Sequence, residues 1–297
     1  MMAHAFAVLM LASLLSIVEQ TACANLLFLS PHTSYSHTNF FLPVIKELAH
    51  RNHTITFWNG LKPRSEIERV TQLSSEQLHH FNTNHKIGFE SNNPFLLLIS
   101  LPDRLTQICN VVYSDPSFEY LIFLKNTTTF DLIVIEGFMN ECMLPLVPYF
   151  NAPFIYLTAL PPLPWMLDMT DSPMSFDHFP CLTTDYTNQM SLFQRSGNTI
   201  MGLVMVHFRH WFILPAVDRV AAQLPIKKVL SPVRQVENNL SLLISNTLTG
   251  LSYSYPKSSA IIDAGGLHFE PSKPLPKVNS SSHLKTDGNS FMRVVFL

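Results

Sequence analysis

The sequence contains little glycine and little charge. Its 297 residues include 9 glycines, where average usage would give roughly 20, and they are scattered along the chain. No Gly-x-Gly-x-x-Gly or Walker-type loop can be built from them, which argues against a self-contained dinucleotide- or phosphate-loop enzyme. Charged residues make up only 13% of the chain, and the formal net charge is −2. This composition argues against intrinsic disorder and against a nucleic-acid partner.

The first 24 residues are typical of a cleaved signal peptide. An apolar run from Phe6 to Val18 is followed by two polar residues and then by Ala22-Cys23-Ala24, a small-residue cleavage pattern. The usual basic segment before the run is missing, so an uncleaved anchor is the alternative, although the run is short for a full membrane span. We therefore expect a mature chain that starts at residue 25 in the secretory pathway, in the lumen of the endoplasmic reticulum.

Cysteine is scarce as well. Cleavage would leave Cys109, Cys142 and Cys181, whose wide spacing excludes both a disulfide scaffold and a zinc site, so no metal is expected. One bridge with one free thiol and three buried thiols both remain open. Four Asn-x-Ser/Thr sequons are candidate glycosylation sites in a luminal protein, at Asn52, Asn126, Asn239 and Asn279.

Short apolar segments alternate with helical patterns along the mature chain. The segments predicted to be strands are residues 25–29, 54–58, 130–136, 152–158, 240–244 and 260–264. Apolar residues between positions 40 and 49 recur at helical spacing, and Pro43 is tolerable only near the first turns, which places the helix start close to His37. Residues 62–125 are ambiguous. The pattern predicts an α/β doubly wound parallel sheet.

Two stretches differ from this alternation. The apolar run Ile200–Val206 is interrupted by His207, Arg209 and His210 before it could span a bilayer, so we expect a buried or interfacial helix with peripheral membrane contact. No other candidate span follows the signal peptide. Residues 278–297 are polar and linker-like before a short apolar end.

Two ionisable residues are expected where a doubly wound sheet binds its ligands, at the carboxyl ends of the strands. His37 follows the first strand, and Glu136 ends a later one. A histidine can accept a hydroxyl proton while a carboxylate orients its ring and stabilises the imidazolium. His32 in the same loop is an equal rival by position, and Glu136 could instead cap a helix.

Several segments resemble animal UDP-glycosyltransferases of the glucuronosyltransferase family, in the family's order. They are Ser36-His37-Thr38-Asn39-Phe40-Phe41-Leu42-Pro43, Leu48–Thr56, Phe130–Glu136, Met190-Ser191-Leu192-Phe193-Gln194-Arg195 with Asn198-Thr199, and Asp263–His268 with Lys273-Pro274-Leu275-Pro276. The departures are Asn52 for a glycine that ends the first helix, Glu136 where vertebrate members usually have aspartate, and two prolines, Pro145 and Pro148, in what should be the next helix. Asparagine still tolerates the left-handed cap conformation.

The resemblance implies the N-terminal half of a two-domain GT-B type glycosyltransferase, whose residues 25–277 form the acceptor-binding, Rossmann-like domain. His37 would deprotonate a small lipophilic phenol or alcohol and Glu136 would steady His37, with inversion at the sugar. The UDP-sugar co-substrate, UDP-glucose or UDP-glucuronate, would be held by the other half, so this half itself would bind no cofactor. Because residues 278–297 do not resemble the family's donor domain or membrane anchor, we expect a chain that is truncated and inactive alone.

Two further interpretations compete with this one. The chain could be a luminal lipophile-binding module or a regulatory partner of full-length relatives, or an unrelated α/β protein. Donor-domain sequence downstream in the transcript would distinguish the transferase from the binding module.

Overall fold

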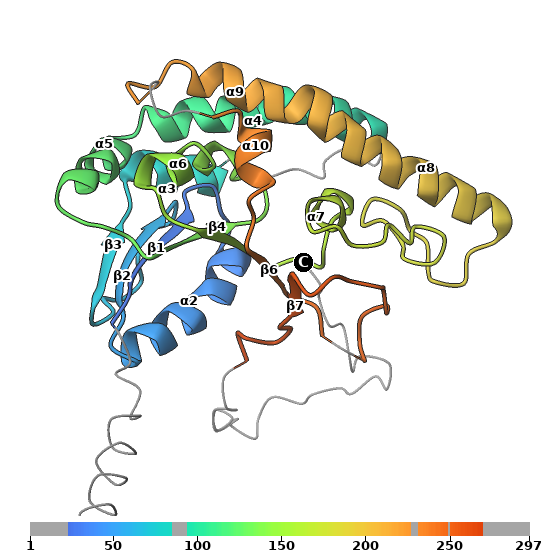
Figure 1. Cartoon of the computed structure of the whole chain (residues 1–297), viewed down its shortest axis with the longest axis horizontal. Coiled ribbons are helices and arrows are strands. Elements are labelled where there is room, and N and C mark those ends of the chain that lie inside the picture. Colours follow the sequence, from blue (N-terminus) through green and yellow to red (C-terminus); the bar gives the residue numbers. More distant parts are fainter. Residues whose placement is uncertain (1–22, 85–93, 227–230, 249, 270–297) are drawn as a thin grey trace, which may run out of the picture.

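The computed structural model describes residues 23–84, 94–226, 231–248 and 250–269. Within these ranges seven parallel strands form one sheet, in the order β3-β2-β1-β4-β5-β6-β7 (Figure 1). The strands are β1 (Asn25–Ser30), β2 (Thr54–Asn59), β3 (Val70–Leu73), β4 (Leu132–Glu136), β5 (Phe154–Thr158), β6 (Leu242–Ser245) and β7 (Ile261–Asp263). The predicted α/β doubly wound parallel sheet is confirmed. The strand order reverses between β1 and β4, which marks their carboxyl ends as the expected ligand site.

The sequence pattern missed one strand. The six predicted strands lie within two residues of observed ones, but β3 falls in the ambiguous stretch 62–125. This four-residue edge strand is only partly buried and contains Thr71 and Gln72, so it lacks the apolar run that marks the central strands. The same stretch holds three helices, α3 (Glu76–Asn84), α4 (Pro94–Tyr113) and α5 (Pro116–Phe123).

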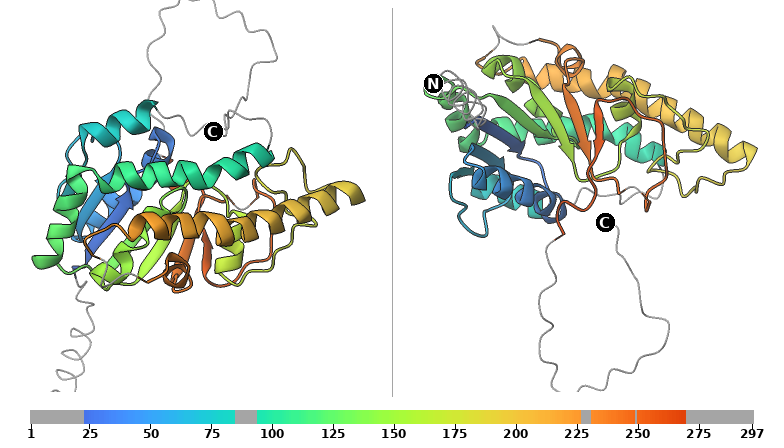
Figure 2. Two further views of the ribbon diagram at one scale, coloured as in Figure 1. Left: turned by 90° about the horizontal axis from the view of Figure 1, so that it is seen from above. Right: turned by 60° about the horizontal axis from the view of Figure 1, so that its bottom comes forward.

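Helices cover the two faces of the sheet unequally. Alternate side chains of β1 and β2 point to opposite faces, and α2 (Tyr35–His50) packs Phe40, Phe41 and Ile45 against one of them (Figure 1). The other described helices lie over the opposite face. They include α6 (Leu146–Phe150), α7 (Pro164–Met169), α8 (Leu192–Phe208), α9 (Leu214–Ala221) and α10 (Val233–Glu237). The long helix that contains α8 and α9 runs beside α4 (Figure 2).

Helix α2 places His37 in its first turn. The helix begins at Tyr35, and the Ser34 side chain caps it by accepting from the His37 backbone N–H at 3.4 Å. The predicted start close to His37 is confirmed, but the reason for it is wrong, because Pro43 lies in the middle of the helix. Asn52, just beyond the helix, has a φ of 70°, so asparagine does adopt the left-handed conformation expected there.

The apolar run Ile200–Val206 belongs to a longer helix than the sequence indicated. Helix α8 continues through a π-helical turn, η3 (Arg209–Ile213), into α9, and the whole segment Leu192–Ala221 is long and apolar enough to cross a membrane by length and composition alone. The expected interruption at Arg209 is therefore wrong. The Arg209 side chain is buried and paired with carboxylates, and half of the most apolar window is buried in the fold, which favours a core helix.

One disulfide bond joins two elements on the face of the sheet opposite α2. Cys109 in α4 is bonded to Cys142 in η2 (Glu141–Met143), the short helix in the segment that follows β4, and Cys181 is a buried free thiol. Of the two arrangements that the sequence left open for Cys109, Cys142 and Cys181, the structure has one bridge and one free thiol. An intact disulfide is typical of an oxidising compartment.

Candidate active site

His37 and Glu136 meet at the carboxyl ends of β1 and β4. Nδ1 of His37 lies 3.0 Å from Oε2 of Glu136, and their side chains are 16% and 0% exposed. An ionised carboxylate only accepts hydrogen bonds, so Nδ1–H donates to it and Nε2 remains as the basic nitrogen of the neutral ring. The Phe138 ring, 6.2 Å from the imidazole, packs beside the pair. This arrangement can take a proton from a hydroxyl group.

Burial and charge act on the pKa of His37 in opposite directions. Burial of the ring lowers it, while the charge of Glu136 and the hydrogen bond to that carboxylate raise it, and the net pKa is above the ordinary 6.5. The ion pair therefore contributes its full stability below pH 6.5, and this contribution is lost as the pH rises through the raised pKa. A general base must be neutral, so catalysis would follow the opposite trend.

Glu136→Gln is expected to bring the pKa of His37 below 6.5, because burial would then act without the opposing carboxylate charge. Titration of the 15N-labelled imidazole by NMR measures the change. The His37 signals are assigned as those that are missing from the spectrum of His37→Gln. The 15N resonances of the exposed His50, at the far end of the same helix, should have the same positions in both proteins at one pH. An unaltered His37 titration would show that Glu136 does not control the ring.

A hollow beside His37 is lined by residues from four parts of the chain. Ser36, His37, Asn39 and Phe40 come from α2, Ala159 and Leu160 follow β5, and Asn246 and His268 follow β6 and β7. Its volume is about 220 Å³, below the range of roughly 300–1,000 Å³ for small-molecule sites. Asn246 and His268 were not predicted as site residues. Their positions after parallel strands were the available signal, since such ends share one edge.

Two asparagines hold the loop between β1 and α2, and the sequence reasoning missed both. Asn82 of α3 accepts from the Thr33 N–H at 2.8 Å and donates to the Pro31 carbonyl at 2.9 Å. Asn140, four residues after Glu136, accepts from the His32 N–H at 3.0 Å and donates to the His32 carbonyl at 2.8 Å. Both contacts are made by side-chain amides on a loop backbone, which no local pattern reveals.

The rival histidine has a different environment. His32 is buried, its ring lies 6.0 Å from that of Phe81, and its backbone bonds to Asn140. Glu136 pairs with His37 across the sheet edge, so the geometry favours its orienting role over helix capping. Among the described residues, no three His, Cys, Asp or Glu side chains are grouped in a way that could hold a metal ion.

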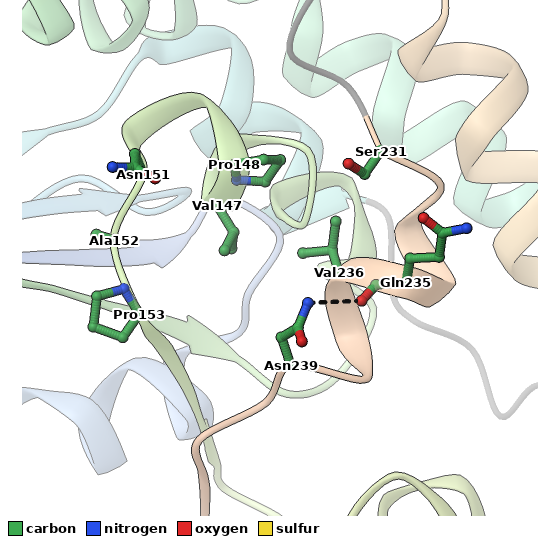
Figure 3. Close-up of a pocket in the computed structure, with 9 residues that line it drawn as sticks. All are labelled: Val147, Pro148, Asn151, Ala152, Pro153, Ser231, Gln235, Val236 and Asn239. Carbon is green, nitrogen blue, oxygen red and sulfur yellow. Dashed lines mark hydrogen bonds between the residues drawn. The ribbon is translucent and has the colours of Figure 1, made fainter.

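A larger hollow lies at the opposite, amino-terminal edge of the sheet (Figure 3). It has a volume of about 460 Å³ and is lined by Val147, Pro148, Asn151, Ala152, Pro153, Ser231, Gln235, Val236 and Asn239. The lining contains no titratable side chain, so the larger hollow offers no acid or base. The smaller hollow has two histidines in its lining, His37 and His268.

A parallel α/β sheet with a carboxylate-supported histidine at its switch point defines a class of proteins able to activate a hydroxyl group. The chain belongs to the UDP-glycosyltransferases, because the family model described as UDP-glucoronosyl and UDP-glucosyl transferase matches residues 43–295. The match excludes an unrelated α/β protein. It includes residues 278–295 of the tail, which lie outside the described residues.

The relatives agree with this family. UDP-glycosyltransferase UGT4 of Dactylopius coccus is 25% identical over 256 residues, which are 85% of this chain and 50% of that relative. UDP-glucuronosyltransferase 1A7 of Mus musculus is 23% identical over 262 residues, 82% of this chain and 47% of its own. The chain thus spans about half the length of the curated relatives that it matches. The solved calicheamicin glycosyltransferase CalG4 is 17% identical, with a TM-score of 0.38, and covers 82% of this chain and 53% of its own.

Proposed function

We propose that this chain is the acceptor-binding half of a two-domain, UDP-sugar-dependent GT-B glycosyltransferase. The single observation that carries the proposal is the 3.0 Å contact between Nδ1 of His37 and the buried carboxylate of Glu136, at the switch point of the sheet. Membership of the UDP-glycosyltransferase family supports the choice of a UDP-sugar as donor.

The proposed reaction is a single displacement. Nε2 of His37 accepts the proton of the acceptor hydroxyl while the oxygen forms a bond to the anomeric carbon of the sugar. The bond from that carbon to the β-phosphate oxygen breaks, and UDP leaves with the electron pair, so the configuration inverts. Glu136 stabilises the imidazolium that forms and keeps the ring in the required tautomer.

A small lipophilic phenol or alcohol suits the hollow beside His37. Phe40, Ala159 and Leu160 give it apolar walls, and Asn39 and Asn246 add amide groups that can orient a polar end. The volume of about 220 Å³ fits a site that a second, donor-binding half would complete. Binding both reactants in one cleft is what converts the transfer into an effectively unimolecular step.

A chimera tests the proposal. The chain would be joined to the donor half of the Dactylopius UDP-glycosyltransferase UGT4 and supplied with UDP-glucose or UDP-glucuronate and a panel of phenols and alcohols. Mass spectrometry should detect a glycoside, and UDP release should depend on the acceptor. A folded chimera that binds UDP-sugar but conjugates no panel member would contradict the proposal.

The second candidate function is a luminal lipophile-binding module or a partner of full-length relatives. The observation that favours it is the apolar wall that Phe40, Ala159 and Leu160 give to the hollow beside His37, which suits a lipophile without any transfer step. Calorimetry on the chain alone, combined with the activity of the chimera, distinguishes the two candidates. Acceptor binding with an inactive chimera supports the module, and binding with an active chimera supports the transferase.

We also propose that the protein matures in the lumen of the endoplasmic reticulum and is glycosylated there. The Cys109–Cys142 bridge supports an oxidising compartment. Asn52, Asn126 and Asn239 are all exposed and precede β2, β4 and β6, so the three sequons share the amino-terminal edge of the sheet, opposite His37. Glycans at this edge would leave the acceptor site open. Asn279 lies outside the described residues.

Digestion with an N-glycosidase is expected to increase the electrophoretic mobility of the secreted or luminal protein. Thr54→Ala, Thr128→Ala and Ser241→Ala remove one sequon each and leave the asparagines in place, which spares the left-handed backbone of Asn52. Loss of each occupied site should increase the mobility by one step. Ser280→Ala is the control, because it changes the middle residue of a sequon and retains both Asn279 and Ser281. A protein that enzyme treatment leaves unaltered is not glycosylated.

A further inference from the structure

The segment that follows Glu136, the last residue of β4, is held to three other parts of the fold. Asn140 bonds to the loop before His37, Glu141 lies 3.3 Å from the buried Arg209 of η3, and Cys142 is bonded to Cys109 of α4. Of these three contacts, only the one made by Asn140 reaches the part of the chain that leads to His37. The His37–Glu136 distance therefore depends on how the loop after β1 is placed against the loop after β4.

Asn140 joins these two loops directly. Its side chain is buried, and its amide bonds to both the N–H and the carbonyl of His32, across 108 residues of sequence. A third hydrogen bond, from Nδ2 to the Phe138 carbonyl at 3.0 Å, fixes the amide to its own loop two residues after Glu136. The carboxamide is therefore a rigid link with hydrogen bonds to both loops, five residues before His37 on one side and four residues after Glu136 on the other.

We propose that Asn140 is a positioning residue for the His37–Glu136 pair, holding the two loops at the separation at which Nδ1 meets the carboxylate. The inference rests on the proposed function only for its catalytic meaning, since the contact itself is a property of this chain. Asn140 would not touch the acceptor. It acts through the loop that leads into α2 and through the segment that follows Glu136.

Asn198 offers a matched control elsewhere in the fold. It is also buried and also bonds a loop through both amide atoms, with Nδ2 donating to the Phe176 and Phe179 carbonyls and Oδ1 accepting from the Cys181 N–H. The residues that it joins lie near α8, and none of them lines the hollow beside His37. Loss of either amide should cost similar stability, because each leaves three backbone groups without their hydrogen-bond partner.

The test compares Asn140→Ala with Asn198→Ala in the full chain, produced in a secretory host so that the disulfide forms. We expect both to lose roughly 5–10 °C of Tm. Only Asn140→Ala should lower the pKa of His37, read by NMR of 15N-labelled histidine, because Glu136 is the charged group that raises it. Asn140→Ser, which keeps one hydroxyl for the His32 backbone, should move the pKa less in the same direction, and it is the variant to use if Asn140→Ala does not fold.

A His37 pKa that stays at the wild-type value in folded Asn140→Ala or Asn140→Ser overturns the inference. So does an equal decrease in Asn198→Ala, which would assign the effect to general loosening. The readout needs no sugar transfer, so an inactive chimera with a responsive His37 would refute the transferase and leave the positioning role intact. An active chimera in which Asn140→Ala leaves the pKa of His37 unaltered would support the transferase and refute the positioning role.

Discussion

His37→Ala, introduced into the chimera with a donor half, is expected to lower kcat/KM for glycoside formation by about 10²–10⁴-fold, the usual contribution of a general base. The acceptor hydroxyl would then have no neutral imidazole to take its proton. Its affinity should stay within a few-fold of wild type, because alanine removes the base and keeps the apolar walls of Phe40 and Leu160. Steady-state kinetics and calorimetry measure the two quantities separately.

The control for this substitution is His50→Ala at the exposed end of the same helix, which should leave turnover unaltered. The pH profile adds an independent check, since kcat/KM of the parent chimera should rise with pH through the raised pKa of His37. Undiminished turnover in His37→Ala would remove His37 from the mechanism. A loss of activity with an equal loss of acceptor affinity would assign His37 to binding.

Arg209→Met is expected to lower the free energy of unfolding by about 3–5 kcal/mol, a large share of the stability of an ordinary domain. Arg209 forms a bidentate ion pair with Glu237, in which Nη1 and Nη2 donate to the carboxylate oxygens at 2.5 and 2.6 Å. Its Nη2 also lies 3.3 Å from Oε1 of Glu141. Burial alone would lower the pKa of Arg209, but the charge of Glu237 raises it above its usual value. Methionine would leave two buried carboxylates without their cation. Urea unfolding of the intact, disulfide-bonded chain measures the loss.

Arg219→Met is the control, because this arginine is exposed on the adjoining α9, and its replacement should stay within about 0.5 kcal/mol. The double variant Arg209→Met/Glu237→Met should recover part of the loss, because it removes one of the two carboxylates left without their cation. If Arg209→Met and Arg219→Met cost the same, the buried cluster contributes nothing to stability. If the double variant is less stable still, the pair is not the source of the loss.

Much of the candidate site can be predicted from the amino-acid sequence. The apolar segments that become β1 and β4 are central and buried, so their composition alone places the strand ends at Leu29 and Glu136, within one residue of those observed. His37 then falls in the first turn of the next helix, where a serine cap at Ser34 starts the helix. The edge strand β3 could not be predicted in this way, because a half-buried strand with polar residues has no distinct pattern.

Arg209 shows where pattern reasoning failed. A cationic residue after an apolar run was interpreted as the end of that run, yet the helix continues through it for the length of α9. The charge is tolerated because Glu237 and Glu141 meet it in the interior. Neither carboxylate is near Arg209 in sequence, so no local window contains the reason for the burial.

The sequence by itself determined the parallel α/β class, six of the seven described strands, and the two ionisable residues at the switch point, because these depend on local apolar patterns and on the rule that parallel strands end at one edge. Only the tertiary structure decided which cysteines pair, where the cation of η3 finds its carboxylates, and that Asn140 links the two loops of the candidate site. These contacts join residues 28 to 108 positions apart. Side chains that far apart meet only after the sheet has formed, and the fold then determines which of them become partners.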